Sequence, residues 1–100
     1  MVNLMNLKES GLIEELEGKI TPDAIIVFGS YAKGEDTETS DIDLFLMAQE
    51  KYLNLARYEK RLQRKIQLFF SEDIHKLPKE LQNNIINGMV VSGFIRWKTS

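Results

Sequence analysis

The 100-residue chain has no cysteine, a single histidine and a single tryptophan. The lack of cysteine excludes a disulfide framework, thiolate metal sites and a cysteine nucleophile, and it agrees with a reducing compartment. A lone histidine excludes a metal centre made of several imidazoles. Any metal site in this chain is therefore expected to use oxygen ligands.

A strong charge of one sign and a long apolar run are missing as well. The 13 basic and 15 acidic residues give a net charge of −2, which does not predict general attraction to nucleic acid or to anionic membranes. The longest apolar runs, among them residues 24–28, are far shorter than the roughly 20 residues of a transmembrane helix. The first residues do not have the basic and apolar regions of a secretory signal. We therefore expect a cytoplasmic protein that does not associate with membranes.

The length predicts a single domain, 1–100, with one core. Apolar residues at helical spacing predict one helix or two short ones over residues 4–20, with Ser10 as the N-cap if the helix breaks there. Strands are predicted at 24–28, 41–47 and 65–70, and a short helix with a following loop at 31–39. The other predicted elements are a helix over 49–64 with the core stripe Tyr52, Leu55, Tyr58 and Leu62, a helix from Pro78 to Gly88, and a strand-like run over 89–95.

The segment that follows the first predicted strand combines Gly29-Ser30 with Asp41 and Asp43. Because side chains alternate along a strand, Asp41 and Asp43 leave the same face. Two neighbouring carboxylates repel each other, and a divalent cation removes that repulsion; oxygen ligands favour Mg²⁺ or Mn²⁺ over zinc. Gly29 permits a close backbone approach, and Ser30 at a helix start offers a hydroxyl and N–H groups to an anion. Together the four residues predict a site for a metal-bound polyphosphate.

Each half of this pattern is weak alone, because a Gly-Ser pair is commonly a turn and an Asp-x-Asp is commonly a solvated strand edge. The joint pattern is much rarer. Four fixed positions at average usages of about 5–7% each occur by chance in roughly one chain of this length in a thousand. The combination, with strands predicted at both places, therefore favours the functional interpretation.

Gly29-Ser30, ten residues and then Asp41-Ile42-Asp43 resembles the signature of the DNA polymerase β-like nucleotidyltransferase superfamily. Within it, the chain resembles the minimal nucleotidyltransferases, with Lys33-Gly34 where that group often has Arg-Gly and with Ser40 directly before the first aspartate. The resemblance implies an α/β (α+β) nucleotidyltransferase fold. Such a fold has a small mixed β-sheet of three or four strands, helices mainly on one face, and an open face that bears Asp41 and Asp43.

The resemblance also implies an activity and partners. Gly29 and Ser30 would hold a nucleoside triphosphate, expected to be ATP, while Asp41 and Asp43 would be the catalytic ligands of Mg²⁺ or Mn²⁺ during transfer of a nucleoside monophosphate. Lys33 is a further candidate for phosphate contact, and Ser40 for the nucleotide site or for holding the turn. Stand-alone domains of this group are often paired, as antitoxin and toxin, with a HEPN-domain protein (higher eukaryotes and prokaryotes nucleotide-binding). Some resemble enzymes that adenylylate a tyrosine of that partner.

The sequence departs from the family pattern at the third carboxylate, which the next strand supplies on the same face. That position is predicted to hold Gln67, whose neutral amide is a poor general base and a weaker ligand. Glu72 or Asp73 would take the role if the strand ran differently. The alternative function is therefore a catalytically impaired module that binds a nucleotide or only a partner. A third hypothesis is transfer to a small molecule without any partner protein.

Two further features have more than one interpretation. Six of the 13 basic residues fall within residues 51–65, which is typical of a solvated helix face but also fits a docking surface for an acidic partner or an RNA. Trp97 is either a lid on the core or an exposed contact for a partner.

Overall fold

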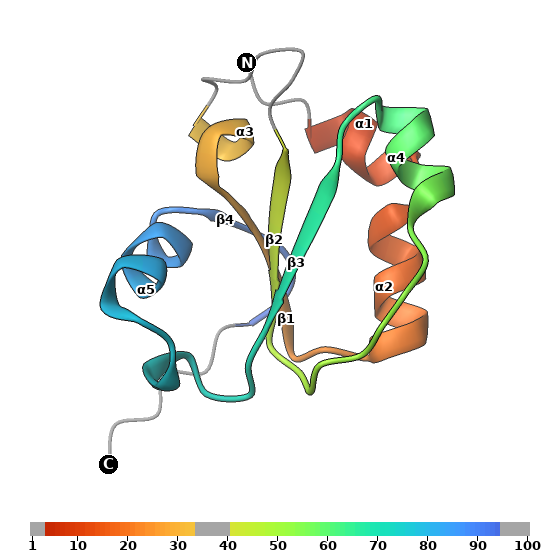
Figure 1. Ribbon diagram of the computed structural model, residues 1–100. Helices are drawn as coiled ribbons and strands as arrows, with labels where there is room; N and C mark the ends of the chain where they lie inside the picture. Colours follow the sequence, from red (N-terminus) through yellow and green to blue (C-terminus); the bar gives the residue numbers. More distant parts are fainter. Residues whose placement is uncertain (1–3, 34–40, 95–100) are drawn as a thin grey trace.

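The computed structural model describes residues 4–33 and 41–94. It contains a four-stranded sheet with the strand order β3-β2-β1-β4 (Figure 1). Strand β1 runs antiparallel to both of its neighbours, whereas β2 and β3 are parallel, so the sheet is mixed as the resemblance implied. The elements in chain order are α1 (Leu4–Glu9), α2 (Leu12–Ile20), β1 (Ala24–Phe28), α3 (Gly29–Lys33), β2 (Ile42–Leu46), α4 (Ala56–Leu62), β3 (Ile66–Phe70), the 3₁₀ turn η1 (Ile74–Lys76), α5 (Lys79–Ile86) and β4 (Met89–Gly93).

Strand directions decide which chain segments meet at each end of the sheet. Phe28, the last residue of β1, lies opposite Asp43 near the start of β2, and Asp43 lies opposite Gln67 near the start of β3. The β2–β3 ladder extends one step further, because the N–H of Ile42 donates to the carbonyl of Lys65 at 2.8 Å. One end of the sheet therefore gathers the β1–α3 turn, both aspartates and the first residues of β3.

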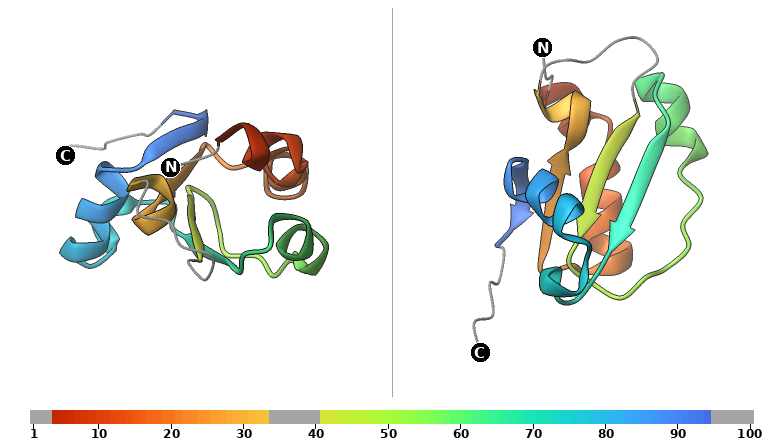
Figure 2. Two further views of the ribbon diagram at one scale, coloured as in Figure 1. Left: turned by 90° about the horizontal axis from the view of Figure 1, so that it is seen from above. Right: turned by 60° about the vertical axis from the view of Figure 1, so that its left-hand side comes forward.

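One face of the sheet is covered by α1, α2 and α4, which Figure 2 shows together on the same side. Alternate residues of each strand point into this face because side chains alternate along a strand. The core includes Ile25 and Val27 from β1 and Leu44 from β2, packed against Leu12 and Leu16 of α2. All five side chains are fully buried. The amphipathic pattern of the first helices therefore lies on the sheet as the sequence predicted.

The other face carries a second, smaller core. It contains Ile26 and Phe28 of β1, Phe45 of β2, and residues of η1 and α5, among them Ile74 and Ile85. The sequence predicted an open face here. The structure corrects that expectation, because α5 and η1 cover the part of the face distant from the aspartates (Figure 1). The prediction that helices lie mainly on one face still holds, because α1, α2 and α4 cover that face. The aspartates lie at the end of the sheet that α5 and η1 do not cover.

The break in the first helical region falls where the sequence placed it. Ser10 is almost fully buried between α1 and α2. Its hydroxyl donates to the carbonyl of Leu7 at 2.6 Å and accepts from the N–H of Leu12 at 3.2 Å. The N-cap of α2 is Gly11 and not Ser10 as the sequence predicted, but the Ser10 side chain still bonds one backbone group on each side of the break.

Substitution of Ser10 by alanine is expected to lower the free energy of unfolding by about 1–2 kcal/mol, because the N–H of Leu12 and the carbonyl of Leu7 lose a buried partner. Denaturant unfolding measures the change. Ser92→Ala is the matched control, because its hydroxyl contacts Glu17 at an exposed position, and it is expected to change stability by less than about 0.5 kcal/mol. Equal effects of the two substitutions would contradict the stabilising role of the two buried hydrogen bonds of Ser10.

The long helix predicted over residues 49–64 is wrong in its first half. Helix α4 begins only at Ala56, and its start is held by Asn54, whose side-chain oxygen accepts from the N–H of Ala56 at 3.0 Å. Tyr52, predicted to face the core, is 87% exposed, while Leu55 and Tyr58 are buried. The predicted stripe of core residues therefore faces the core only from Leu55 onward. Because the Asn54 side chain bonds the backbone just before α4, the helix begins later than the apolar spacing suggested.

The other elements agree with the sequence prediction to within a few residues. The strand at 24–28 is as predicted, and the strands at 41–47 and 65–70 are slightly shorter. Helix α3 begins at Gly29, two residues before the predicted 31–39 segment. Ser40, Gly34 and Trp97 lie outside the described residues. Within 4–33 and 41–94, the model has no helix with the length and apolar character needed to span a bilayer.

Candidate functional site

The turn from β1 into α3 brings Gly29 directly against Asp43. Gly29 has a φ of 78°, a left-handed conformation that side chains disfavour. A Cβ at this position would collide with a carboxylate oxygen of Asp43. Glycine is therefore required at position 29 both by the backbone conformation and by the lack of space for a side chain. The same contact brings the Gly-Ser half of the motif against its Asp-x-Asp half.

Asp41 and Asp43 are both half-buried at the start of β2. Asp43 lies opposite Phe28, whose ring contacts that of Phe69 with a centroid distance of 5.4 Å. Burial beside these apolar groups, and to a smaller extent the charge of Asp41, raise the pKa of the Asp43 carboxyl above its usual 3.8. Neither aspartate forms an ion pair with a cation among the residues that the structure describes. The pair is therefore held at an electrostatic cost that a bound cation would remove.

This cost predicts that Asp43→Asn stabilises the metal-free protein at neutral pH. Because the pKa of Asp43 is raised on folding, the folded chain binds the proton more tightly than the unfolded chain. The stabilisation by the protonated carboxyl is full below pH 3.8 and is lost as the pH rises through the folded pKa. Thermal unfolding in EDTA should therefore show a higher Tm for the variant at pH 7 and an equal Tm near pH 3.

Glu72→Gln is the matched control for that measurement, because it removes the same charge from an exposed residue beyond the far end of β3. It is expected to leave the Tm nearly unchanged at both pH values. A Tm of Asp43→Asn at pH 7 equal to or below that of the wild type would contradict the electrostatic cost assigned to this carboxyl.

Gln67 occupies the position that the sequence predicted for it. It lies opposite Asp43 in the parallel ladder, and its Nε2 donates to Oδ2 of Asp41 at 2.6 Å. The alternatives Glu72 and Asp73 lie beyond the opposite end of β3, where Asp73 accepts from the N–H of His75 at 2.9 Å and so caps η1. Gln67 therefore faces the aspartates, and the amide replaces a carboxylate at that point.

The oxygen ligands of the site decide how a divalent metal could be held. Among residues 4–33 and 41–94 no group of three or more His, Cys, Asp or Glu side chains gathers in a geometry that would hold a metal by itself. Two carboxylates on one face are nevertheless what Mg²⁺ uses when water and substrate phosphates complete its octahedron. The site therefore fits a cation that arrives with a polyphosphate, and not a cation held by protein ligands alone.

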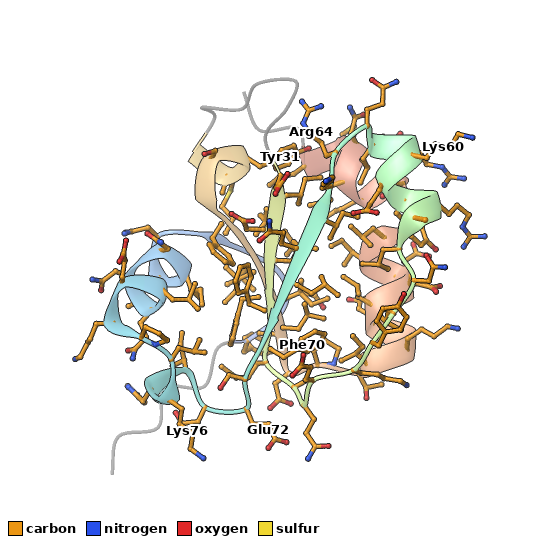
Figure 3. The ribbon with its side chains drawn as sticks, in the orientation of Figure 1. Tyr31, Lys60, Arg64, Phe70, Glu72 and Lys76 are labelled. Carbon is orange, nitrogen blue, oxygen red and sulfur yellow. The ribbon has the colours of Figure 1, made fainter. Side chains whose placement is uncertain are left out.

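The structure describes only some of the remaining residues of the motif. Ser30 is exposed in the first turn of α3, next to Gly29, as expected of a residue that meets a ligand. Lys33 ends α3, and Ser40 lies outside the described residues. The sequence analysis did not identify Tyr31 (Figure 3), which is only 5% exposed and belongs to the core between the sheet and helices α1, α2 and α4. Its aromatic ring within an otherwise small and polar segment was the available signal.

A separate hollow of about 780 Å³ lies at the opposite end of the sheet. Polar side chains that follow β2 and β3 or precede β1 line it, among them Asp23, Glu50 and Glu72. It contains none of the motif residues. Its position after the ends of β2 and β3 separates it from the aspartates by the length of the strands, so it is not part of the candidate site.

Comparison with known proteins identifies a family and similar proteins. Residues 10–93 match the model of the family described as "Polymerase beta, Nucleotidyltransferase". Two proteins of Methanocaldococcus jannaschii, each named "Putative protein adenylyltransferase", are 37% and 35% identical over 81 residues. These alignments cover 71% and 73% of this chain and 81% and 83% of the relatives.

A solved structure described as "Crystal structure of the toxin-antitoxin with AMP-PNP" contains a chain with a similar fold. The TM-score is 0.64 with 24% sequence identity, and the match covers 86% of this chain and 73% of that chain. At this identity the likeness concerns the fold.

Proposed function

Because this chain belongs to the polymerase β nucleotidyltransferase family, we propose that it transfers a nucleoside monophosphate, AMP from ATP, to a hydroxyl group of a partner protein. The contact between Gly29 and Asp43, with Asp41 on the same strand face, supports the proposal most directly. This contact brings the Gly-Ser and Asp-x-Asp halves of the pattern together in space. Two motifs that occurred independently by chance would not be expected to meet in this way.

The proposed roles follow from the positions of the groups. Gly29 and Ser30 bind the triphosphate through the backbone and hydroxyl of the β1–α3 turn, with Lys33 and Ser40 as further candidates for contact. Asp41 and Asp43 would hold Mg²⁺ or Mn²⁺ together with phosphate oxygens, and that cation would neutralise charge on the phosphates during transfer. Most of the rate would then come from positioning and charge neutralisation.

The transfer itself exchanges one phosphorus–oxygen bond for another. The oxygen of the acceptor hydroxyl attacks the α-phosphorus, the bond from that phosphorus to the bridging oxygen of the β-phosphate breaks, and pyrophosphate leaves with the electron pair. The hydroxyl proton passes to solvent or to a nearby carboxylate. The acceptor thereby gains an AMP group in phosphodiester linkage, and ATP is consumed stoichiometrically.

The partner that we propose is a HEPN-domain toxin, so that the chain acts in an antitoxin-like role. The names of the M. jannaschii relatives support protein as the acceptor, and the toxin–antitoxin complex with a similar fold supports the pairing. Neither of these two arguments for a protein partner depends on the length of this chain.

Incubation of the protein with Mg²⁺, a HEPN-domain protein from the same cells and ATP labelled at the α-phosphate tests the proposal. Label should appear on the HEPN protein, and none should appear with ATP labelled at the γ-phosphate. The double variant Asp41→Asn/Asp43→Asn is the control and should transfer nothing. Label on a small molecule in the absence of any protein acceptor would instead favour the small-molecule hypothesis.

One observation favours the alternative of an impaired module that binds a nucleotide or a partner without catalysis. Gln67 offers an N–H to Asp41 where the family places a third carboxylate, and an amide cannot accept the hydroxyl proton. Under this alternative MgATP binds and no label is transferred to any acceptor.

A further inference from the structure

Positive charge is concentrated on one part of the surface of this otherwise slightly acidic chain. Residues 51–65 contain six basic residues and one acid, a local charge of +5 in a chain with a net charge of −2. Three that lie at the end of α4 and just before β3 are here called the basic edge: Lys60, Arg61 and Lys65.

Lys60, Arg61 and Lys65 form no ion pair with an acidic side chain among the residues that the structure describes. Arg61 donates to the carbonyl of Ser10 at 2.7 Å, and Arg57 donates to the hydroxyl of Tyr58 at 2.8 Å. The one acid of the segment, Glu59, accepts from the backbone N–H of Ile66 at 2.8 Å. Arg61 is thus positioned by a neutral oxygen, and the charges of Lys60, Arg61 and Lys65 remain available to an anionic partner.

The basic edge adjoins the candidate site. Lys65 accepts the N–H of Ile42 on its carbonyl at 2.8 Å, which sets it opposite Asp41 in the β2–β3 ladder. By strand alternation it belongs to the same face as Gln67. Figure 3 shows Lys60 and Arg64 at the end of the molecule where Tyr31 of α3 also lies. Positive charge therefore begins at the edge of the site and extends outward over α4.

Strand order separates the two sides of the site. Gly29 and Ser30 lie on the β1 side of the aspartates, and Gln67 and Lys65 lie on the β3 side. With the triphosphate at the β1–α3 turn, an acceptor approaches from β3. An acidic acceptor would be repelled by Asp41, Asp43 and the triphosphate, and a flanking strip of cations offsets that repulsion.

We propose that the basic edge docks an acidic segment of the acceptor protein and so brings its hydroxyl to the aspartates. The proposal rests on the proposed function. A protein segment fits better than RNA, because no exposed aromatic side chain that would stack on bases lies between the residues of the basic edge. Tyr58 is 6% exposed with Arg57 over its ring, and the exposed Tyr52 lies on the loop before α4.

Fluorescence anisotropy of a labelled peptide of repeating Glu-Glu-Tyr tests the docking surface, with a Lys-Lys-Tyr peptide and an oligouridine of equal length as competitor probes. The variant is Lys60→Glu/Lys65→Glu. Its matched control is Lys76→Glu/Lys79→Glu, which makes the same charge change on exposed residues at η1 and α5. We expect the variant to bind the acidic peptide at least about 10-fold more weakly, the control to bind within about 2-fold of wild type, and wild-type binding to weaken with salt.

Equal losses in variant and control, no wild-type binding of the acidic peptide at low salt, or tighter binding of oligouridine would each overturn the proposal. The neutral variant Lys60→Gln/Lys65→Gln, with a smaller expected loss, replaces the charge reversal if the latter unfolds. MgATP binding is measured on every variant: intact MgATP binding with lost peptide binding supports the docking surface. Absence of MgATP binding in the wild type would defeat the proposed function instead.

Discussion

Gln67→Asp should raise the rate of AMP transfer by about 100-fold, because it supplies a carboxylate that can accept the acceptor's proton and ligate a cation. Gln67 is already in the required position, opposite Asp43 and within hydrogen-bonding distance of Asp41. The gain requires divalent metal, since three neighbouring carboxylates without a cation repel one another. Transfer of α-phosphate label from ATP to the HEPN partner, with single-turnover rates, measures it.

Gln67→Asn is the matched control, because it has the length of aspartate and keeps a neutral amide. Its rate is expected to stay at or below that of wild type. A Gln67→Asp variant that binds MgATP normally but transfers no faster than wild type would show that the missing carboxylate does not limit this protein. The same result would remove the physical basis for the impaired-module alternative.

Gly29→Ala is expected to weaken MgATP binding by about 10- to 100-fold, because the displaced turn would lose a hydrogen bond of about 1.5–3 kcal/mol to the charged triphosphate. The added Cβ would require a left-handed conformation of an alanine and would push the Asp43 carboxylate out of its place. Backbone strain of this kind also lowers the free energy of unfolding by about 1–3 kcal/mol. Calorimetric titration and denaturant unfolding measure the two effects.

Gly18→Ala serves as the control for that substitution. Gly18 lies within α2, and an added Cβ would meet nothing within 4 Å. Alanine there should raise stability by up to about 1 kcal/mol and leave nucleotide binding unchanged. If Gly29→Ala bound MgATP as tightly as Gly18→Ala, the β1–α3 turn would not be the triphosphate site.

Local patterns predicted most of the fold. The strand at 24–28 is a short apolar run bounded by turn residues, and its position, length and burial agree with the structure. The stripe over 49–64 overextended one helix because apolar spacing does not register a competing side-chain cap such as Asn54. The helix on the second face was predicted, but its packing over Phe45 depends on contacts between Ile74, Ile85 and the sheet that no local pattern contains.

The sequence predicted which residues of the candidate site lie together in more detail than it predicted the packing of the fold around them. Alternation alone placed Asp41 and Asp43 together, and the next strand placed Gln67 beside them. The collision that forces glycine at position 29, the amide bond from Gln67 to Asp41 and the raised pKa of Asp43 all depend on strands brought together by the tertiary fold. Register between strands of different sequence segments is the information that a single sequence lacks.

The most direct test is calorimetric titration of MgATP into the wild type and into Asp41→Asn/Asp43→Asn, since it needs no acceptor. We predict saturable binding by the wild type that requires the divalent metal and disappears in the double variant, while the variant stays folded. Absence of wild-type binding at millimolar nucleotide, or equal binding by the double variant, would contradict a metal–triphosphate site at the two aspartates.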